Sequence, residues 1–138
     1  ALLRVKLRHL DDWNRLRRRW AAVYLEALKG DGGLKLPSVI IDAEPVWHLF
    51  VVRHPRRNDL QRHLEKEGIE TLIHYPFPPH RSEAYADAVF PDGGFPVTDE
   101  LASTVRSLPM GPQLCREDVM QVIAAVKRFT AGAGGPAA

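Results

Sequence analysis

The chain has 138 residues, which suits one domain that can bury roughly 68% of its unfolded surface. With 45% hydrophobic and 26% charged residues it resembles a globular protein, and a formal charge of +2 gives no reason to expect nucleic acid binding. No apolar run approaches the roughly 20 residues of a membrane helix, and the lone Cys115 excludes an internal disulfide, which together favour the cytoplasm.

The first predicted element is a long amphipathic helix that ends near Leu28, before the glycines at 30, 32 and 33. Its apolar stripe recurs at intervals of three or four: Leu3, Leu7, Leu10, Trp13, Leu16, Trp20, Val23 and Ala27. No Ser, Thr, Asp or Asn caps the opening "ALLRV". We therefore expect the chain to begin inside a longer helix of a larger protein, with a frayed native terminus as the alternative.

A strand, a helix and a second strand follow. The run "PVWHLFVVR" (45–53) is apolar on both faces and rich in β-branched and aromatic residues, which predicts a strand central in its sheet. Asn58 is placed to cap the next helix, and Gly68 to stop it. Residues 69–73 are the second predicted strand, and a proline-rich loop follows them.

The remaining chain alternates short helices with loops. Residues 82–88 predict a short helix, and the turn-rich "FPDGGFP" (90–96) predicts a loop. Thr98 is placed to cap a helix over 99–107, and a brief extended segment is expected at 108–110. The last helix, about 116–129, places one stripe inward: Val119, Val122, Ile123, Val126 and Phe129.

Together these elements predict an α/β fold of the α+β sandwich kind. Helices pack against a small, mainly antiparallel or mixed sheet, and the long first helix leads in. Residues 1–130 form the single expected domain, and residues 131–138 a flexible tail.

Several kinds of site have no signal in the sequence, which contains no GxGxxG, P-loop or GxSxG pattern. His74 and His80 are six residues apart, which suits neither one helix face nor a usual zinc pattern, so no metal site is expected. His48 lies in the middle of the first predicted strand, where a hydrogen-bonded core position is expected. Surface positions are expected for His9, His54 and His63.

The stretch "GIETLIHYPFPPH" (68–80) combines a strand end with three prolines. Prolines fix φ and lower the entropy lost when a loop becomes ordered. His74 and Tyr75 stand where the strand ends, and His80 where the prolines stop. Imidazole and phenol groups donate to sugar hydroxyls or phosphate while presenting an apolar ring face. The residues alone leave two interpretations open: a rigid loop facing a ligand, or Tyr75 in the core and His80 as a helix cap.

Five segments occur in an order that carries a resemblance: "HLDDWNRLRRRWAAVYLEAL", "VWHLFVVR", "GIETLIHYPFPPH", "AYADA" and "LPMGP", the last followed by a terminal helix. They resemble the C-terminal part of the pyridoxal-phosphate-dependent nucleotide-sugar aminotransferases, the DegT–StrS group of the fold-type I aminotransferase superfamily. The similarity covers nearly the whole chain except its tail. The "HYPFPPH" form particularly resembles enzymes that place an amino group on a keto-sugar attached to dTDP.

The resemblance implies that the reactive groups lie elsewhere. Such enzymes need a lysine for the Schiff base and donors for the phosphate of pyridoxal phosphate (PLP), which the family carries in a large N-terminal domain. No lysine here stands in a context like the family's cofactor loop: Lys6, Lys29, Lys35, Lys66 and Lys127. The resemblance therefore implies a C-terminal small domain that lacks the PLP-binding domain, has no catalytic residue, binds no cofactor and is inactive alone.

The same resemblance implies that His74, Tyr75 and His80 bind the nucleotide-sugar substrate, with His74 positioning it and not acting as a general base. The full-length enzyme is then expected to be a homodimer that takes the amino group from a donor, usually glutamate. Two alternatives stay open. One is a PLP-dependent sugar dehydratase of the same family, with histidine in place of the cofactor lysine; the other is a self-standing, non-catalytic α/β binding module.

Overall fold

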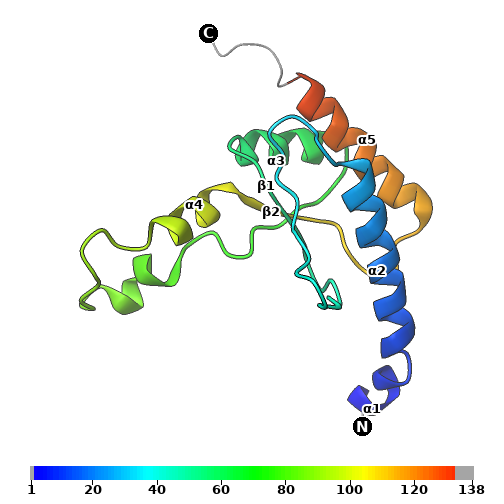
Figure 1. Ribbon diagram of the computed structural model, residues 1–138, viewed down its shortest axis with the longest axis horizontal. Helices are drawn as coiled ribbons and strands as arrows, with labels where there is room; N and C mark the ends of the chain where they lie inside the picture. The colour runs from blue at the N-terminus through cyan, green and yellow to red at the C-terminus, as the bar shows by residue number, and fades with distance from the viewer. Residues whose placement is uncertain (1, 133–138) are drawn as a thin grey trace.

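Two short antiparallel strands lie at the centre of the fold, and helices pack beside them (Figure 1). In the computed structural model, which describes residues 2–132, β1 (Phe50–Arg53) pairs with β2 (Val105–Leu108). The register places Phe50 opposite Leu108. The predicted α/β class with a small antiparallel sheet is therefore confirmed.

Single backbone bridges widen this sheet on both sides. The N–H groups of Lys35 and Arg53 each donate to the other's carbonyl oxygen, at 2.8 and 2.9 Å. On the far side of β2, the Ser107 N–H donates to the Leu72 carbonyl at 2.8 Å. β1 thus has backbone partners on both sides, as expected of a central strand, whereas the strand predicted at 69–73 is only a bridge at Leu72.

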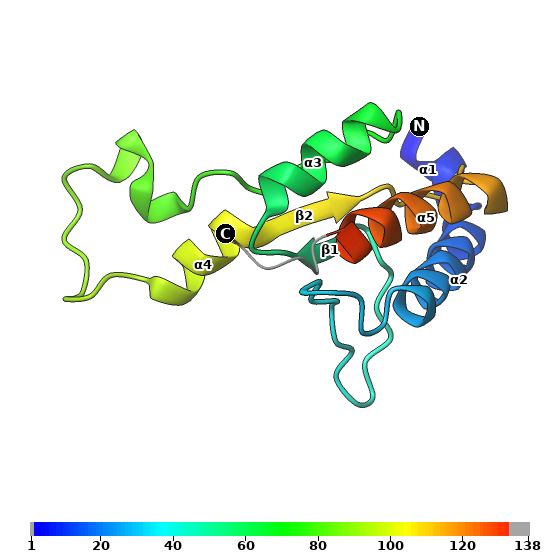
Figure 2. The same ribbon diagram turned by 90° about the horizontal axis from the view of Figure 1, so that it is seen from above.

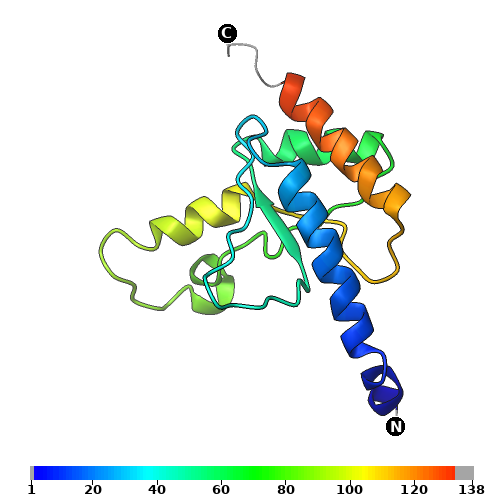
Figure 3. The same ribbon diagram turned by 45° about the vertical axis from the view of Figure 1, so that its right-hand side comes forward.

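Three helices enclose the core: α2 (Leu10–Ala27), α3 (Arg57–Lys66) and α5 (Arg116–Gly132). Helix α5 packs against both α2 and α3 (Figure 3). All the residues of its predicted apolar stripe are buried. The rings of Tyr24 and Phe50 are fully buried with centroids 4.9 Å apart, which joins α2 to β1. We refer to β1, β2 and these three helices as the body.

Residues 75–104 form an arm that projects from the body (Figure 2). The arm contains two short 3₁₀ turns, η1 (Pro79–Arg81) and η2 (Glu83–Tyr85), and the helix α4 (Pro96–Thr104). Pro78 is its one buried residue. The arm therefore has almost no core of its own.

The long N-terminal helix of the prediction is two helices. Helix α1 (Leu2–Leu7) ends in a tight turn, in which the N–H groups of Arg8 and His9 donate to carbonyls three residues earlier, at 3.3 and 3.0 Å. Helix α2 begins after this turn. Trp20 is the one fully buried residue of the predicted apolar stripe. The stripe is half-buried at Trp13, Leu16, Val23 and Ala27, and exposed at Leu3, Leu7 and Leu10.

Three other predicted elements are shorter or different. The strand expected over 45–53 is reduced to Phe50–Arg53, because Trp47 has a φ of 52° and leaves the extended region. The helix expected over 82–88 is reduced to the 3₁₀ turn η2, while the other turn, η1, lies before the predicted range. The helix expected to reach residue 107 ends at Thr104, because the next four residues pair with β1 as β2.

Both predicted helix caps are wrong. Helix α3 begins at Arg57, one residue before Asn58, and the N–H of Arg56 donates to His54 Nδ1 at 2.9 Å. Helix α4 begins at Pro96, whose missing N–H and fixed φ suit a first helical position, so Thr98 lies inside the helix.

Two further predictions concern the residues at which helices end. Gly68 follows α3 with a φ of 74°, the left-handed conformation expected of the predicted stop. Helix α5 runs through Gly132, so the first two residues of the predicted tail are helical, and residues 133–138 lie outside the described residues. No helix within residues 2–132 is long and apolar enough to cross a membrane.

Candidate substrate-binding site

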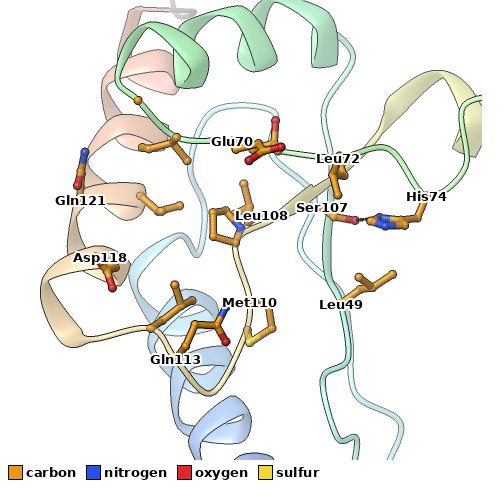
Figure 4. Close-up of a pocket in the computed structure, with 16 residues that line it drawn as sticks. Leu49, Glu70, Leu72, His74, Ser107, Leu108, Met110, Gln113, Asp118 and Gln121 are labelled. Carbon is orange, nitrogen blue, oxygen red and sulfur yellow. Dashed lines mark hydrogen bonds between the residues drawn. The ribbon is translucent and has the colours of Figure 1, made fainter.

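A hollow of about 490 Å³ opens beside β2, where the proline loop leaves the body (Figure 4). We call it the His74 hollow. Helix α5 contributes Asp118 and Gln121 on one side, and His74 and Leu49 lie on the opposite side. Its polar lining consists of Glu70, Thr71, His74, Ser107, Gln113, Asp118 and Gln121.

The His74 hollow carries negative charge. Among the residues that the structure describes, its lining includes the carboxylates of Glu70 and Asp118 but no lysine or arginine. The Cys115 N–H donates to Asp118 at 2.8 Å, and this hydrogen bond lowers the pKa of the Asp118 carboxyl group. An ionised carboxylate accepts hydrogen bonds only, so the hollow suits ligand hydroxyl or amino groups and disfavours phosphate.

His74 is held at the edge of this hollow. Its Nδ1 atom lies 2.8 Å from the hydroxyl oxygen of Ser107, and its ring is half-buried. The ring of Tyr75 meets it edge to face, with centroids 5.9 Å apart. The structure therefore brings two of the three predicted site residues together.

Two smaller hollows continue from His74 along the arm. The first, which we call the proline groove, has a volume of about 230 Å³ and is lined by His74, Tyr75 and Pro79, among others. The second, the aromatic box, has about 320 Å³ and is lined by Pro79, His80, Tyr85, Phe90, Phe95 and Thr98. His74 is shared by the first two hollows, and Pro79 by the last two. The three hollows therefore adjoin in a row.

His80, the third predicted residue, lies in the aromatic box with 13% of its side chain exposed. Its Nε2 atom lies 3.1 Å from the carboxylate of Asp99, which also accepts from Arg81 Nε at 2.8 Å. The bond from Arg81 is the main reason that the pKa of Asp99 is lowered. The rings of Phe95 and Phe90 flank the imidazole, at 5.0 and 6.1 Å between centroids.

These positions bear on the interpretations that the sequence left open. Tyr75 is 77% exposed, so it is not a core residue. His80 contacts Asp99, whereas the hydroxyl of Ser82 itself accepts from the Ala84 N–H at 3.4 Å. No local pattern indicated Ser107 or Asp99 as partners, because both contacts join residues far apart in the chain.

The burial of the other histidines differs from the prediction at several positions. His48 is exposed and outside β1, so its predicted core position is wrong. His54 is 4% exposed, packs edge-on against Phe129 with centroids 5.2 Å apart, and is not a surface residue. His63 is half-buried and bonds to the Ala125 carbonyl at 3.0 Å, while His9 is exposed as predicted. Within residues 2–132, no three His, Cys, Asp or Glu side chains are grouped to hold a metal ion.

Comparison with known proteins places the chain in a family. The sequence profile of the DegT/DnrJ/EryC1/StrS aminotransferase family matches residues 1–127. The chain belongs to this family. It is 54% identical over 127 residues to the erythromycin biosynthesis sensory transduction protein EryC1 of Saccharopolyspora erythraea, covering 92% of this chain and 35% of that protein. It is 48% identical over 129 residues to the dTDP-3-amino-3,4,6-trideoxy-α-D-glucose transaminase of Streptomyces venezuelae, covering 94% and 34%.

The fold agrees with the family assignment. The crystal structure of S. venezuelae DesV in complex with a ketimine intermediate superposes with a TM-score of 0.91 and 48% identity, over 94% of this chain and 35% of that one. The chain thus spans about a third of the length of these DegT-family relatives.

Proposed function

We propose that this chain is the C-terminal small domain of a nucleotide-sugar aminotransferase, and that it forms one wall of the substrate cleft. The full enzyme would transfer an amino group, with glutamate as donor, to a keto-sugar attached to dTDP, for amino-sugar biosynthesis. The observation that carries the proposal is the 48% identity over 94% of this chain to a dTDP-amino-sugar transaminase.

The cofactor proposed for the full enzyme is PLP, which serves as electron sink and amino-group carrier when bound. The residues of this chain do not fit a covalent PLP site. All five lysines are exposed, and none lines the His74 hollow, the proline groove or the aromatic box. We therefore assign cofactor binding and catalysis to the portion of the relatives that this chain does not span.

The proposed task of this domain is to bind and orient the sugar. The carboxylates and amides of the His74 hollow accept from and donate to hydroxyl groups, and the apolar surfaces of Leu72 and Met110 suit the C–H face of a pyranose. His74 and Tyr75 stand where this hollow meets the proline groove, and His80 lies further along the row. All three are assigned to substrate binding and none to proton transfer.

The exposed apolar side chains support a partner surface. In the arm, Tyr75, Phe77 and Val97 are 77%, 76% and 68% exposed. Leu3 of α1 is 82% exposed. Apolar surface of this kind in one segment is typical of an interface. We propose that the N-terminal PLP-binding domain covers it in a cytoplasmic homodimer.

A chimera tests the proposal. Residues 1–132 replace the matching third of the S. venezuelae transaminase, and conversion of a dTDP-keto-sugar with glutamate and PLP is measured. We expect turnover, and we expect His74→Ala to lower kcat/KM by about tenfold, the effect of one lost hydrogen bond.

The matched control is His48→Ala, which removes an exposed imidazole outside the three hollows. It should leave kcat/KM unchanged. A chimera that loads PLP but turns over no sugar nucleotide, or equal losses in the two variants, would contradict the proposal. For the chain alone, mass spectrometry after reduction should show no stoichiometric attachment of PLP.

A further inference from the structure

We propose that the hydroxyl group of Ser107 positions His74: it fixes the imidazole orientation and keeps the ring proton on Nε2, where a ligand oxygen can accept it. This inference rests on the proposed function, because it concerns how His74 is prepared to bind substrate. Ser107 also lines the His74 hollow, and the role proposed for it here is a positioning role that acts through His74.

Ser107 is a rigid anchor. It lies in β2 opposite Val51 of β1, and on its other side its N–H donates to the Leu72 carbonyl at 2.8 Å. The Leu72 N–H returns a longer bond of 3.4 Å to the Ser107 carbonyl. With 5% exposure, Ser107 is buried between these two backbone neighbours. Its hydroxyl group is therefore held by the sheet, whereas His74 lies where the chain leaves the sheet for the arm.

The direction of the hydrogen bond follows from the surroundings. Ser107 Oγ has one hydrogen-bond partner among the described residues, His74 Nδ1 at 2.8 Å. If Nδ1 carried the proton and donated it, the buried hydroxyl hydrogen would have no acceptor within residues 2–132, which is costly. The hydroxyl group therefore donates to Nδ1, and neutral His74 carries its proton on Nε2.

This arrangement gives His74 a defined role in binding. Nε2 makes no hydrogen bond to the described residues, so its N–H is available to an incoming ligand. The carboxylates of Glu70 and Asp118 in the same hollow accept hydrogen bonds but cannot donate them. The Nε2–H group adds a donor to an acceptor-rich wall, which suits a ligand oxygen such as a sugar hydroxyl or a keto oxygen.

The hydroxyl group contributes nothing to the backbone pairing, so Ser107→Ala should preserve the sheet. Long-range ¹H–¹⁵N correlation of the imidazole rings, recorded on the 138-residue chain at a pH where they are neutral, reports which nitrogen carries the proton. His74→Ala assigns the His74 signals. The matched control is Ser103→Ala, whose hydroxyl donates to the Glu100 carbonyl within the arm at 2.8 Å.

We expect wild-type His74 to be the Nε2–H tautomer, Ser107→Ala to lose this preference, Ser107→Thr to restore it and Ser103→Ala to keep it. A wild-type proton on Nδ1, a preference unchanged in Ser107→Ala, or a Ser107→Thr variant that behaves like alanine would each overturn the inference. If Ser107→Ala fails to fold, a wild-type proton on Nδ1 still overturns the inference, and Ser107→Cys, whose thiol is a weaker donor, replaces alanine in the comparison.

The chimera separates this inference from the proposed function. There, Ser107→Ala should lower kcat/KM by about threefold to tenfold, mainly through a higher KM, and Ser107→Thr should recover most of it. A tautomer shift without any kinetic effect would overturn the role of His74 in binding substrate. An unchanged tautomer would overturn positioning by Ser107, whatever the chimera does.

Discussion

Helices α4 and α5 show how differently the arm and the body use their residues. Helix α5 has 17 residues, seven of them buried, and it packs against both α2 and α3. Helix α4 has nine residues and buries none. Apolar side chains occur in both helices, so composition does not explain the difference. The body surrounds its helices with other elements, whereas the arm projects away from them (Figure 2).

His74 lies where these two regions meet. From the body it gains a fixed partner, the buried hydroxyl of Ser107. From the arm it gains an open neighbour, the exposed ring of Tyr75. The binding role proposed for His74 needs a fixed orientation and access to a ligand, and these two requirements conflict within a packed core. The junction satisfies both, because the core supplies the rigidity and the projecting loop supplies the access.

The largest expected contrast concerns two phenylalanines. Phe50 is fully buried, with the rings of Tyr24 and Trp47 at 4.9 and 5.5 Å between centroids, whereas Phe77 is 76% exposed. Phe50→Ala should lower the free energy of unfolding by about 3–5 kcal/mol, the usual cost of such a cavity. Phe77→Ala should change it by less than about 0.5 kcal/mol. Urea denaturation checks both values, and a comparable loss in the two variants would show that the arm has a core after all.

The body was the more predictable region. The α5 stripe from Val119 to Phe129 follows helical periodicity and is buried as expected, because periodicity reports directly on which face packs inward. Most of strand β2 was missed, since of its residues only Leu108 falls in the extended segment expected at 108–110. Residues 105–107 follow directly on the helical pattern of α4, so the sequence predicted them as its last turn. They pair instead with β1, and pairing with a distant segment leaves little signal in the local sequence.

The site was predictable only in part, for the same reason. The proline-rich sequence pointed to His74 and Tyr75 as candidate site residues. These two side chains do lie together, because they are adjacent in the sequence. Ser107 is 33 residues from His74, inside a segment predicted as helix, so nothing local could join them. The cap at Asn58 failed because α3 begins at Arg57, which places Asn58 inside the helix. The N–H of Arg56, just before the helix, donates to His54 Nδ1.

The second prediction concerns how the stability of the body depends on pH. Burial is the main cause that lowers the pKa of His54 from its ordinary 6.5. As the pH falls below about 6.5, the unfolded chain takes up a proton at this site and the folded chain does not, so the unfolded state is favoured. The stability linked to His54 is therefore complete above its unfolded pKa and declines as the pH falls through the lower folded pKa.

Urea midpoints measured between about pH 7.5 and pH 5 should show this decline, and His54→Gln should make the curve flatter. His48→Gln removes an exposed imidazole and serves as the matched control. Equal pH dependence in the two variants would mean that burial of His54 does not set the acid sensitivity of the body.

The smallest expected effect concerns the arm, where polar pairs replace a core. Asp99 of α4 joins η1 by accepting from Arg81 and His80, at 2.8 and 3.1 Å. Asp99→Asn should leave global unfolding almost unchanged, because exposed ion pairs contribute little to it. It should nevertheless loosen the arm, and limited proteolysis within residues 82–95 should become faster.

Asp87→Asn is the matched control, since Asp87 makes no ion pair with the described residues. The pKa of Asp99 is lowered chiefly by the Arg81 bond, so its contribution is present above the ordinary value of 3.8 and is lost as the pH falls through the folded value. At neutral pH an acid-stable protease should therefore cleave the wild-type arm more slowly than the arm of Asp99→Asn. The two cleavage rates should become equal only when the pH falls below the folded pKa of Asp99. If both variants are cut at the wild-type rate near neutral pH, the pairs at Asp99 do not hold the arm.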